Sequence, residues 1–171
     1  MAYAEYKIGE YVVYGTSGVC CVEDIGIRRL SPDIPEEEYY ILKPVNNTGS
    51  TVFVPVNNEL LMSRMRHIFT KDEIDGIINS VRGCEMKWID DRKIRITEFR
   101  SIINRGDRRE LILLIRCILS RISFLNENKK KIASSDGDIL QLAQKAVGEE
   151  FSFSLGIKMS EIPAYIEGIL E

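Results

Sequence analysis

The sequence has few of the side chains that enzymes and metal proteins most often use at their sites. It contains four cysteines without the C-x-x-C spacing that indicates a zinc or redox site. Its single histidine, His67, has no evident nucleophile or metal-ligand partner. Glycine-rich phosphate-binding motifs of the types G-x-x-x-x-G-K-[ST] and strand-linked G-x-G-x-x-G are also absent. We therefore expect no metal and no cofactor, and we predict that the protein is not an enzyme.

Long hydrophobic runs are missing as well. The best one, Leu111 to Ile115, ends at Arg116 and is far too short to span a bilayer. The first residues lack both the basic and the apolar region of a signal peptide. We therefore expect a cytoplasmic protein without a membrane segment, in which the cysteines stay reduced. These cysteines are Cys20, Cys21, Cys84 and Cys117.

An excess of basic residues is also missing, since the formal net charge is -3 at pH 7. This charge argues against a protein that grips nucleic acid by bulk electrostatics. The distribution is uneven, however: residues 87–109 carry eight basic and four acidic side chains, whereas residues 136–171 carry seven acidic side chains and two lysines. Any contact with DNA is therefore expected in the middle of the chain.

The first sixty or so residues have the pattern of β-strands. Short runs of β-branched and aromatic residues alternate with turn residues such as Gly15-Thr-Ser-Gly18. The strands expected from these runs are Tyr11 to Tyr14, Val19 to Ile27, Tyr39 to Val45 and Thr51 to Val56. The pattern predicts a small, strongly bent antiparallel sheet or barrel.

After Asn58 the hydrophobic period changes to that of helices. Thr70-Lys-Asp-Glu73 and Asp107-Arg-Arg-Glu110 have capping-box spacing and predict two helix starts. Gly106 should end a helix that begins near Asp90 and buries Ile96, Phe99 and Ile103. The helix after Asp107 has a broad apolar stripe formed by Leu111, Leu114, Ile115, Ile118, Leu119 and Ile122.

Two more helices complete the expected carboxy-terminal part. One should run from about Ser135 to Gly156, and a short terminal one should contain Ile162, Ile166 and Ile169. We therefore predict an α+β protein in which a β domain, residues 1–66, precedes a compact helical bundle, residues 67–171.

Trp88 is the single tryptophan, and two interpretations of it stay open. A lone tryptophan most often belongs to a core. Trp88, however, lies just before Asp90-Asp91, which should open a helix, and next to the basic residues Arg92, Lys93 and Arg95. An aromatic side chain in such a place could act as an apolar wedge in a DNA minor groove while its neighbours contact phosphates.

The strand Thr51-Val-Phe-Val-Pro55 also allows two interpretations. It could be an ordinary strand, but proline is tolerated mainly at the edge or end of a sheet. An edge strand can pair with a strand of another protein. We expect a monomer. The same strand edge could also pair with that of a second copy of the chain, which makes an edge-strand dimer possible.

Several motifs, taken in order, resemble the CarD/CdnL family of bacterial RNA polymerase-binding regulators, whose amino-terminal module is shared with the transcription-repair coupling factor. The motifs span nearly the whole chain. They are Tyr6-Lys-Ile-Gly9-Glu-Tyr-Val-Val-Tyr14 with Gly18-Val19, Tyr39-Tyr-Ile-Leu-Lys43, Thr51-Val-Phe-Val-Pro55, Trp88 before a helix, and Ile102-Ile-Asn-Arg-Gly-Asp-Arg-Arg-Glu-Leu111.

The resemblance implies a Tudor-like β-barrel that binds the RNA polymerase β subunit, partly by pairing an edge strand. The family's polymerase-facing positions are occupied by Arg28, Arg29, Leu30, Val52 and Phe53. The resemblance further implies a helical domain that stabilises the promoter open complex from the upstream edge of the bubble. There Trp88 would enter the minor groove without strong sequence preference.

The same resemblance makes Arg92, Lys93 and Arg95 the phosphate partners of Trp88. Three departures from the family pattern stand out: Gly15 replaces a proline, Phe53 replaces an arginine, and Asp90-Asp91 stand where basic or polar residues are usual. The acidic pair should weaken the attraction to phosphate. An alternative therefore stays open, in which the chain is a protein-only polymerase adaptor without direct DNA contact.

Overall fold

The computed structural model describes residues 6–171 and confirms the α+β class. Contacts between residues divide the chain into two compact units, the first ending at Ile68 and the second running from Phe69 to Glu171. Each unit has its own cluster of buried apolar side chains. The two units are therefore described separately.

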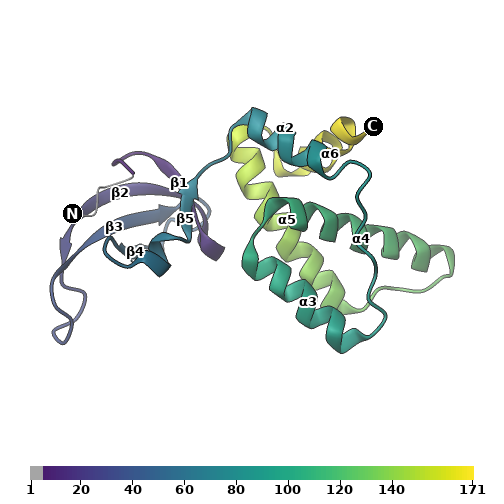
Figure 1. Ribbon diagram of the computed structural model, residues 1–171, viewed down its shortest axis with the longest axis horizontal. Helices are drawn as coiled ribbons and strands as arrows, with labels where there is room; N and C mark the ends of the chain where they lie inside the picture. Colours follow the sequence, from purple (N-terminus) through teal and green to yellow (C-terminus); the bar gives the residue numbers. More distant parts are fainter. Residues whose placement is uncertain (1–5) are drawn as a thin grey trace. The chain divides into compact units, whose positions relative to one another are not determined.

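The first unit contains a five-stranded antiparallel sheet with the strand order β4-β3-β2-β1-β5 (Figure 1). Its elements are β1 (Tyr11–Tyr14), η1 (Gly15–Ser17), β2 (Gly18–Arg28), β3 (Glu37–Pro44), β4 (Val52–Pro55), α1 (Glu59–Met62) and β5 (Met65–His67). The four expected strands are all present, whereas the short α1 and β5 were not expected. Because β4 and β5 end the strand order, closure into a barrel stays a prediction.

The core of this unit lies on one face of the sheet. Alternate residues of neighbouring strands, such as Val12, Tyr40 and Leu42, are completely buried there. Tyr6 closes the core, because its hydroxyl donates a 2.9 Å hydrogen bond to the carbonyl of Met65. A register shift between Val22 and Asp24 bends the long strand β2.

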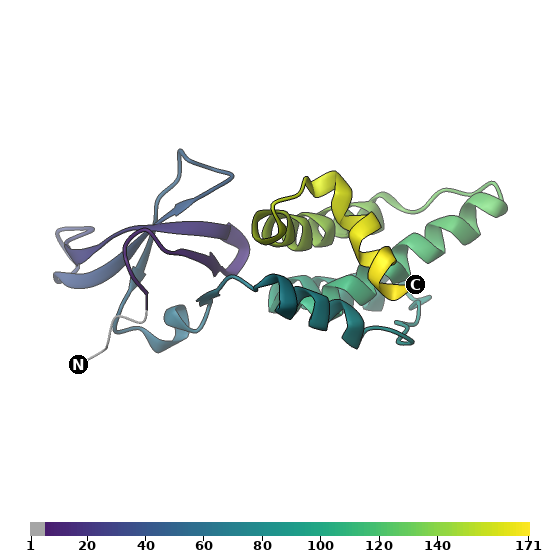
Figure 2. The same ribbon diagram turned by 90° about the horizontal axis from the view of Figure 1, so that it is seen from above.

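The second unit is a bundle of helices in which α5 packs against both α3 and α4 (Figure 1). The elements are α2 (Lys71–Ser80), α3 (Arg92–Arg105), α4 (Arg108–Glu127), α5 (Ser134–Leu155), η2 (Met159–Glu161) and α6 (Ile162–Leu170). After α5 the chain turns and α6, yellow in Figure 2, returns along the bundle to pack against α2. The expected helices are thus confirmed.

The helix ends follow the predicted chemistry with one exception. The Thr70 and Glu73 side chains form the complete capping box at the start of α2. At α4 only half of the predicted box forms: Asp107 accepts from the backbone N–H of Glu110, whose own carboxylate pairs with Arg105 instead. Gly106, with φ of 67°, ends α3 as predicted.

Two ion pairs lie inside the helical unit. Arg95 pairs with Asp136 and Arg108 with Glu150, and in each pair the side chains are 7% and 1% exposed. Because Arg95 occupies the buried face of α3, the predicted burial pattern of that helix is shifted. Phe99 is buried as expected, but the other buried apolar residue of α3 is Ile102.

Candidate functional site

In the β unit, one row of side chains crosses three strands on the sheet face opposite the core. Asp24 on β2 is directly opposite Ile41 on β3, which is in turn opposite Phe53 on β4. Directly paired residues point to the same face, so Asp24 and Phe53 share the outer face. Phe53 is 37% exposed, and its ring and that of Tyr39 form a T-shaped pair with a centroid distance of 6.1 Å.

Arg28 joins this outer row although it lies four residues beyond Asp24 on the same strand. Its Nη2 donates a 2.6 Å hydrogen bond to the Asp24 carboxylate, with both side chains about half exposed. Gly26 leaves room for the Arg28 side chain to extend to Asp24, since a Cβ added at Gly26 would lie 3.1 Å from Nη1 of Arg28. The structure therefore places Arg28 and Phe53 on one face, with a carboxylate beside the guanidinium.

The other three expected polymerase-facing residues have different positions. Val52 is opposite Leu42, a core residue, so it points to the inner face and is half-buried. Arg29 and Leu30 follow the end of β2, where Arg29 donates to the carbonyl of Pro32 and Leu30 is 45% exposed. Of the five expected polymerase-facing residues, Arg28 and Phe53 are therefore the two that lie together on the outer face.

Strand β4 is an end strand of the sheet, as the sequence pattern suggested. It pairs with β3 and has no second strand partner among residues 6–171. Phe53 and the open backbone edge of β4 thus lie together. An extended segment of another protein could add to this edge by main-chain hydrogen bonds.

In the helical unit, Trp88 lies in the segment between α2 and α3, and its ring is half-buried. The ring forms a T-shaped pair with the ring of Phe99 in the core, at a centroid distance of 6.0 Å. Two guanidinium groups lie over the ring, that of Arg95 at 4.4 Å and that of Arg121 at 5.2 Å from its centroid. Both distances are in the range of cation–π contacts.

Arg95, one of the expected phosphate partners, is engaged inside the helical unit. It is 6% exposed, and its guanidinium donates to Asp136 and to the carbonyls of Ile89 and Asp90. The hydrogen bond with Asp136 raises the pKa of Arg95. The charge of Arg95 is therefore already paired with a carboxylate inside the unit. The structure thus shows an internal partner for Arg95, while its expected contact with phosphate stays a prediction.

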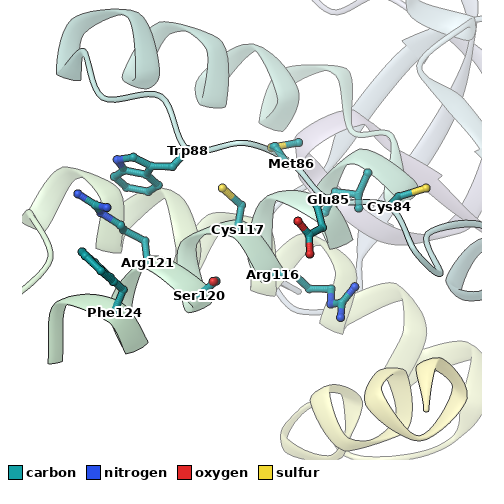
Figure 3. A pocket seen from close by; sticks show the side chains of 10 residues that line it. Cys84, Glu85, Met86, Trp88, Arg116, Cys117, Ser120, Arg121 and Phe124 are labelled. Atoms are coloured by element: carbon teal, nitrogen blue, oxygen red, sulfur yellow. The ribbon is translucent and has the colours of Figure 1, made fainter. Parts of the chain in front are cut away.

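Arg121 and Phe124 of α4 were not expected at this site. Figure 3 shows the Arg121 side chain between the rings of Trp88 and Phe124, and its guanidinium carbon lies 5.1 Å from the Phe124 centroid. The Nε of Arg121 is buried and has no hydrogen-bond partner among the described residues. The sequence signal was weak, because Arg121 lies beside the apolar stripe of α4 without a motif.

These residues line an open pocket of about 430 Å³. Its walls come from the segment after α2 and from α4 (Figure 3). The lining residues are Cys84, Glu85, Met86, Trp88, Leu113, Arg116, Cys117, Ser120, Arg121 and Phe124. Burial raises the pKa of the Cys117 thiol, so this side chain is neutral at pH 7. The pocket thus combines aromatic surface with guanidinium groups, a combination suited to an anionic or nucleic-acid ligand.

The remaining expected phosphate partners, Arg92 and Lys93, are exposed in the first turn of α3. Asp91 caps that helix by accepting from the backbone N–H of Ile94 at 2.9 Å. The acidic pair before α3 therefore has a structural use, since a carboxylate is favourable at a helix N-terminus. It still places negative charge close to Arg92.

The structure gives no sign of a metal centre in the described part of the chain. No group of three or more histidine, cysteine, aspartate or glutamate side chains could hold an ion among residues 6–171. His67 is engaged on the surface of the β unit, where its Nδ1 lies 3.0 Å from a carboxylate oxygen of Glu10. No helix in the described residues is both long enough and apolar enough to cross a membrane.

Comparison with known families identifies the first unit. The family model described as CarD-like/TRCF RID domain matches residues 6–66, which include all five strands except the last residue of β5. The match confirms the resemblance inferred from the motifs over these residues. No curated protein matches the sequence significantly.

Proposed function

We propose that this chain, a CarD-like family member by its amino-terminal RNA polymerase-interacting module, stabilises the promoter open complex. In this proposal the β unit binds the polymerase β subunit, and the Trp88 surface of the helical unit contacts DNA at the upstream edge of the bubble. The CarD-like family is regulatory and non-enzymatic, so the expected action is through binding.

The β unit supports the polymerase contact through its outer face and the open edge of β4. Phe53 offers exposed aromatic area, Arg28 offers a charge, and the backbone of β4 offers main-chain hydrogen bonds. An edge paired with a strand of the β subunit would explain why these features lie together.

The observation that carries the DNA part is the environment of Trp88. One part of its ring is packed on Phe99, while the ring also lines an open pocket beside Arg121. A half-exposed ring with a guanidinium next to it has the two components of a minor-groove wedge, apolar surface and a phosphate partner. Arg121 takes the place in this proposal that the sequence had suggested for Arg95, together with Arg92 and Lys93.

Weak affinity for free DNA is compatible with this action. The net charge of -3 gives no general attraction to nucleic acid, but binding to polymerase supplies a local concentration on the order of millimolar. Stabilising the open complex by about 1.4 kcal/mol relative to the closed one would shift their ratio about tenfold. A contact between Trp88 and DNA that contributes only this small free energy is therefore sufficient to stabilise the open complex.

The protein-only adaptor is the second candidate, and the packing of Trp88 on the core favours it. A tryptophan that contacts Phe99 and stacks on a buried Arg95 could serve the fold alone. The adaptor and the DNA-binding regulator differ in one respect, which is whether the exposed part of the Trp88 ring touches DNA.

The test is the lifetime of open complexes on a weak promoter with the cognate polymerase. We would compare wild type, Trp88→Ala, Trp88→Phe and the double variant Arg28→Ala/Phe53→Ala. Circular dichroism would first establish that each variant is folded. Polymerase binding would be measured in parallel, so that loss of docking is separated from loss of the DNA contact.

We expect Trp88→Ala to bind polymerase normally and to lose most of the lifetime gain, with Trp88→Phe in between because it keeps an aromatic ring. The double variant should lose polymerase binding and the lifetime gain together. If Trp88→Ala is folded, binds polymerase and prolongs the open complex as wild type does, the DNA contact is refuted and the adaptor remains.

A further inference from the structure

We propose that Arg95 is a positioning residue for Trp88, held by Asp136, so that this buried ion pair sets the orientation of the DNA-contacting ring. The inference rests on the proposed function of Trp88. It explains why a buried ion pair is present at a place where apolar side chains could stabilise the fold as well.

The first part of the argument is the way in which Asp136 holds Arg95. Its two carboxylate oxygens accept from Nε at 2.9 Å and from Nη2 at 3.0 Å. This is the bidentate geometry that fixes both the place and the plane of a guanidinium. Asp136 lies in the first turn of α5 and is 1% exposed, so the pair anchors the start of α3 to the start of α5.

The second part is the backbone that follows Trp88. The remaining nitrogen of Arg95, Nη1, donates to the carbonyl of Ile89 at 2.8 Å and to that of Asp90 at 3.1 Å. These two carbonyls are the first ones after Trp88 in the chain. Arg95 therefore fixes the path of the segment from which the indole extends.

The third part is the ring itself, which has the Arg95 guanidinium 4.4 Å from its centroid. Phe99, one helical turn after Arg95 on α3, meets the ring at an interplanar angle of 70°. The same planar group thus binds a carboxylate, supports the backbone and stacks on the indole, which a lysine ammonium could not do at once. The ring is preorganised before it meets any ligand.

The helical unit contains a matched pair for comparison. Arg108–Glu150 also joins an arginine to α5 and has the same side-chain exposures as Arg95–Asp136. Glu150 lies 14 positions after Asp136 on α5, which places it about 20 Å further along at 1.5 Å per residue. The two pairs have the same burial, but only the Arg95 guanidinium lies over the Trp88 ring.

The experiment compares two apolar replacements, Arg95→Met/Asp136→Leu and Arg108→Met/Glu150→Leu, in the full chain. Each double variant removes both charges of its buried ion pair, so both should keep the helical circular dichroism and unfold cooperatively. The single variant Arg95→Lys is added because it keeps the charge but loses the planar fork. Trp88 is the single tryptophan, so near-ultraviolet circular dichroism and acrylamide quenching report on its ring.

We expect Arg95→Met/Asp136→Leu to weaken the near-ultraviolet circular dichroism band of tryptophan and to increase acrylamide quenching. For Arg95→Lys, we expect that neither signal fully reaches its wild-type value. The control pair should leave both signals as in wild type. With polymerase still bound, the open-complex lifetime of the first variant should fall to within about twofold of that of Trp88→Ala, since displacement of a positioned group removes most of its effect.

Two results would overturn the inference, and they differ from the failure of the proposed function. Unchanged tryptophan signals in a folded Arg95→Met/Asp136→Leu variant would mean that Arg95 does not orient the ring. A lifetime like that of wild type despite changed signals would mean that the orientation does not matter. Failure of the proposed function would instead be shown by Trp88→Ala: this variant would prolong the open complex as wild type does, whatever the spectra of the Arg95 variants.

Discussion

At the scale of the residue, the role of an arginine in the helical unit depends on what faces its guanidinium. Arg95 and Arg108 face buried carboxylates and are internal. Arg121 faces the rings of Trp88 and Phe124, and its buried Nε has no hydrogen-bond partner among the described residues. Cation–π contacts hold a guanidinium in place without satisfying its hydrogen-bond donors. In the proposed function, Arg121 is therefore the cation beside Trp88 that contacts a phosphate.

The first prediction concerns Arg121→Gln, which keeps a polar side chain and removes the charge. Because one phosphate contact would be lost, the slope of log affinity against log salt should fall by about 1 for fork-junction DNA in the polymerase complex. The control is Arg105→Gln, since Arg105 already pairs with Glu110. Equal salt slopes for wild type and Arg121→Gln would remove Arg121 from the DNA contact.

The second prediction concerns the thiols of the pocket. Burial raises the pKa of Cys117 and also restricts access to it, whereas Cys84 is half-buried. Cys84 should therefore react with a disulfide reagent at pH 8 much faster than Cys117. Reaction rates of Cys84→Ser and Cys117→Ser, followed by mass spectrometry of the labelled chain, would check this order. Loss of the fast phase in Cys117→Ser, with no change in Cys84→Ser, would contradict it.

At the scale of the element, local signals predicted the helices well because caps and helical periods depend on residues close in the sequence. The Thr70 cap, the stop at Gly106 and the apolar stripe of α4 are examples. The strand β5 escaped prediction, since its three residues pair with β1, which lies more than fifty residues earlier. The role of Arg95 escaped for the same reason, because Asp136 is 41 residues away.

The third prediction concerns the contact between α2 and α6. Asp75 accepts hydrogen bonds from Lys71 at 2.6 Å and from the hydroxyl of Tyr165 at 2.5 Å. Lys71 first, and then Tyr165, lower the pKa of the Asp75 carboxyl. A folded-state pKa below the unfolded value of about 3.9 means stability that is present at higher pH and lost as the pH falls through the folded value.

Asp75→Asn should therefore unfold at a temperature roughly 2 to 4 °C lower than wild type at pH 7, a small effect because the site is partly exposed. The difference should be constant above about pH 5 and shrink below about pH 4, where wild type becomes protonated. Thermal unfolding at several pH values gives the test. A difference that grows in acid would show that the carboxylate is not the stabilising form.

At the scale of the whole molecule, the two units divide the proposed work between them. The match to the CarD-like/TRCF RID domain covers residues 6–66, so this module lies in the β unit. The basic segment and Trp88 belong to the helical unit. Sequence motifs suggested both of the proposed surfaces. They could not show that Val52 points inward or that Arg121 joins Trp88, because strand register and helix packing decide these contacts.

The fourth prediction follows from the separate cores of the two units. Residues 69–171, produced alone, should keep helical circular dichroism and unfold cooperatively, because the buried cluster of this unit is formed by its own helices. The fragment should nevertheless prolong open complexes only when it is added at a concentration on the order of millimolar, which tethering supplies in the intact chain.

The measurement is a titration of the fragment into open-complex lifetime assays, beside the intact chain and the fragment with Trp88→Ala. The intact chain should act at far lower concentration, and the substituted fragment should be inactive throughout. A folded fragment that matches the intact chain at low concentration would mean that docking of the β unit contributes nothing. A folded fragment without effect, even at millimolar concentration, would mean that the β unit contributes more than local concentration.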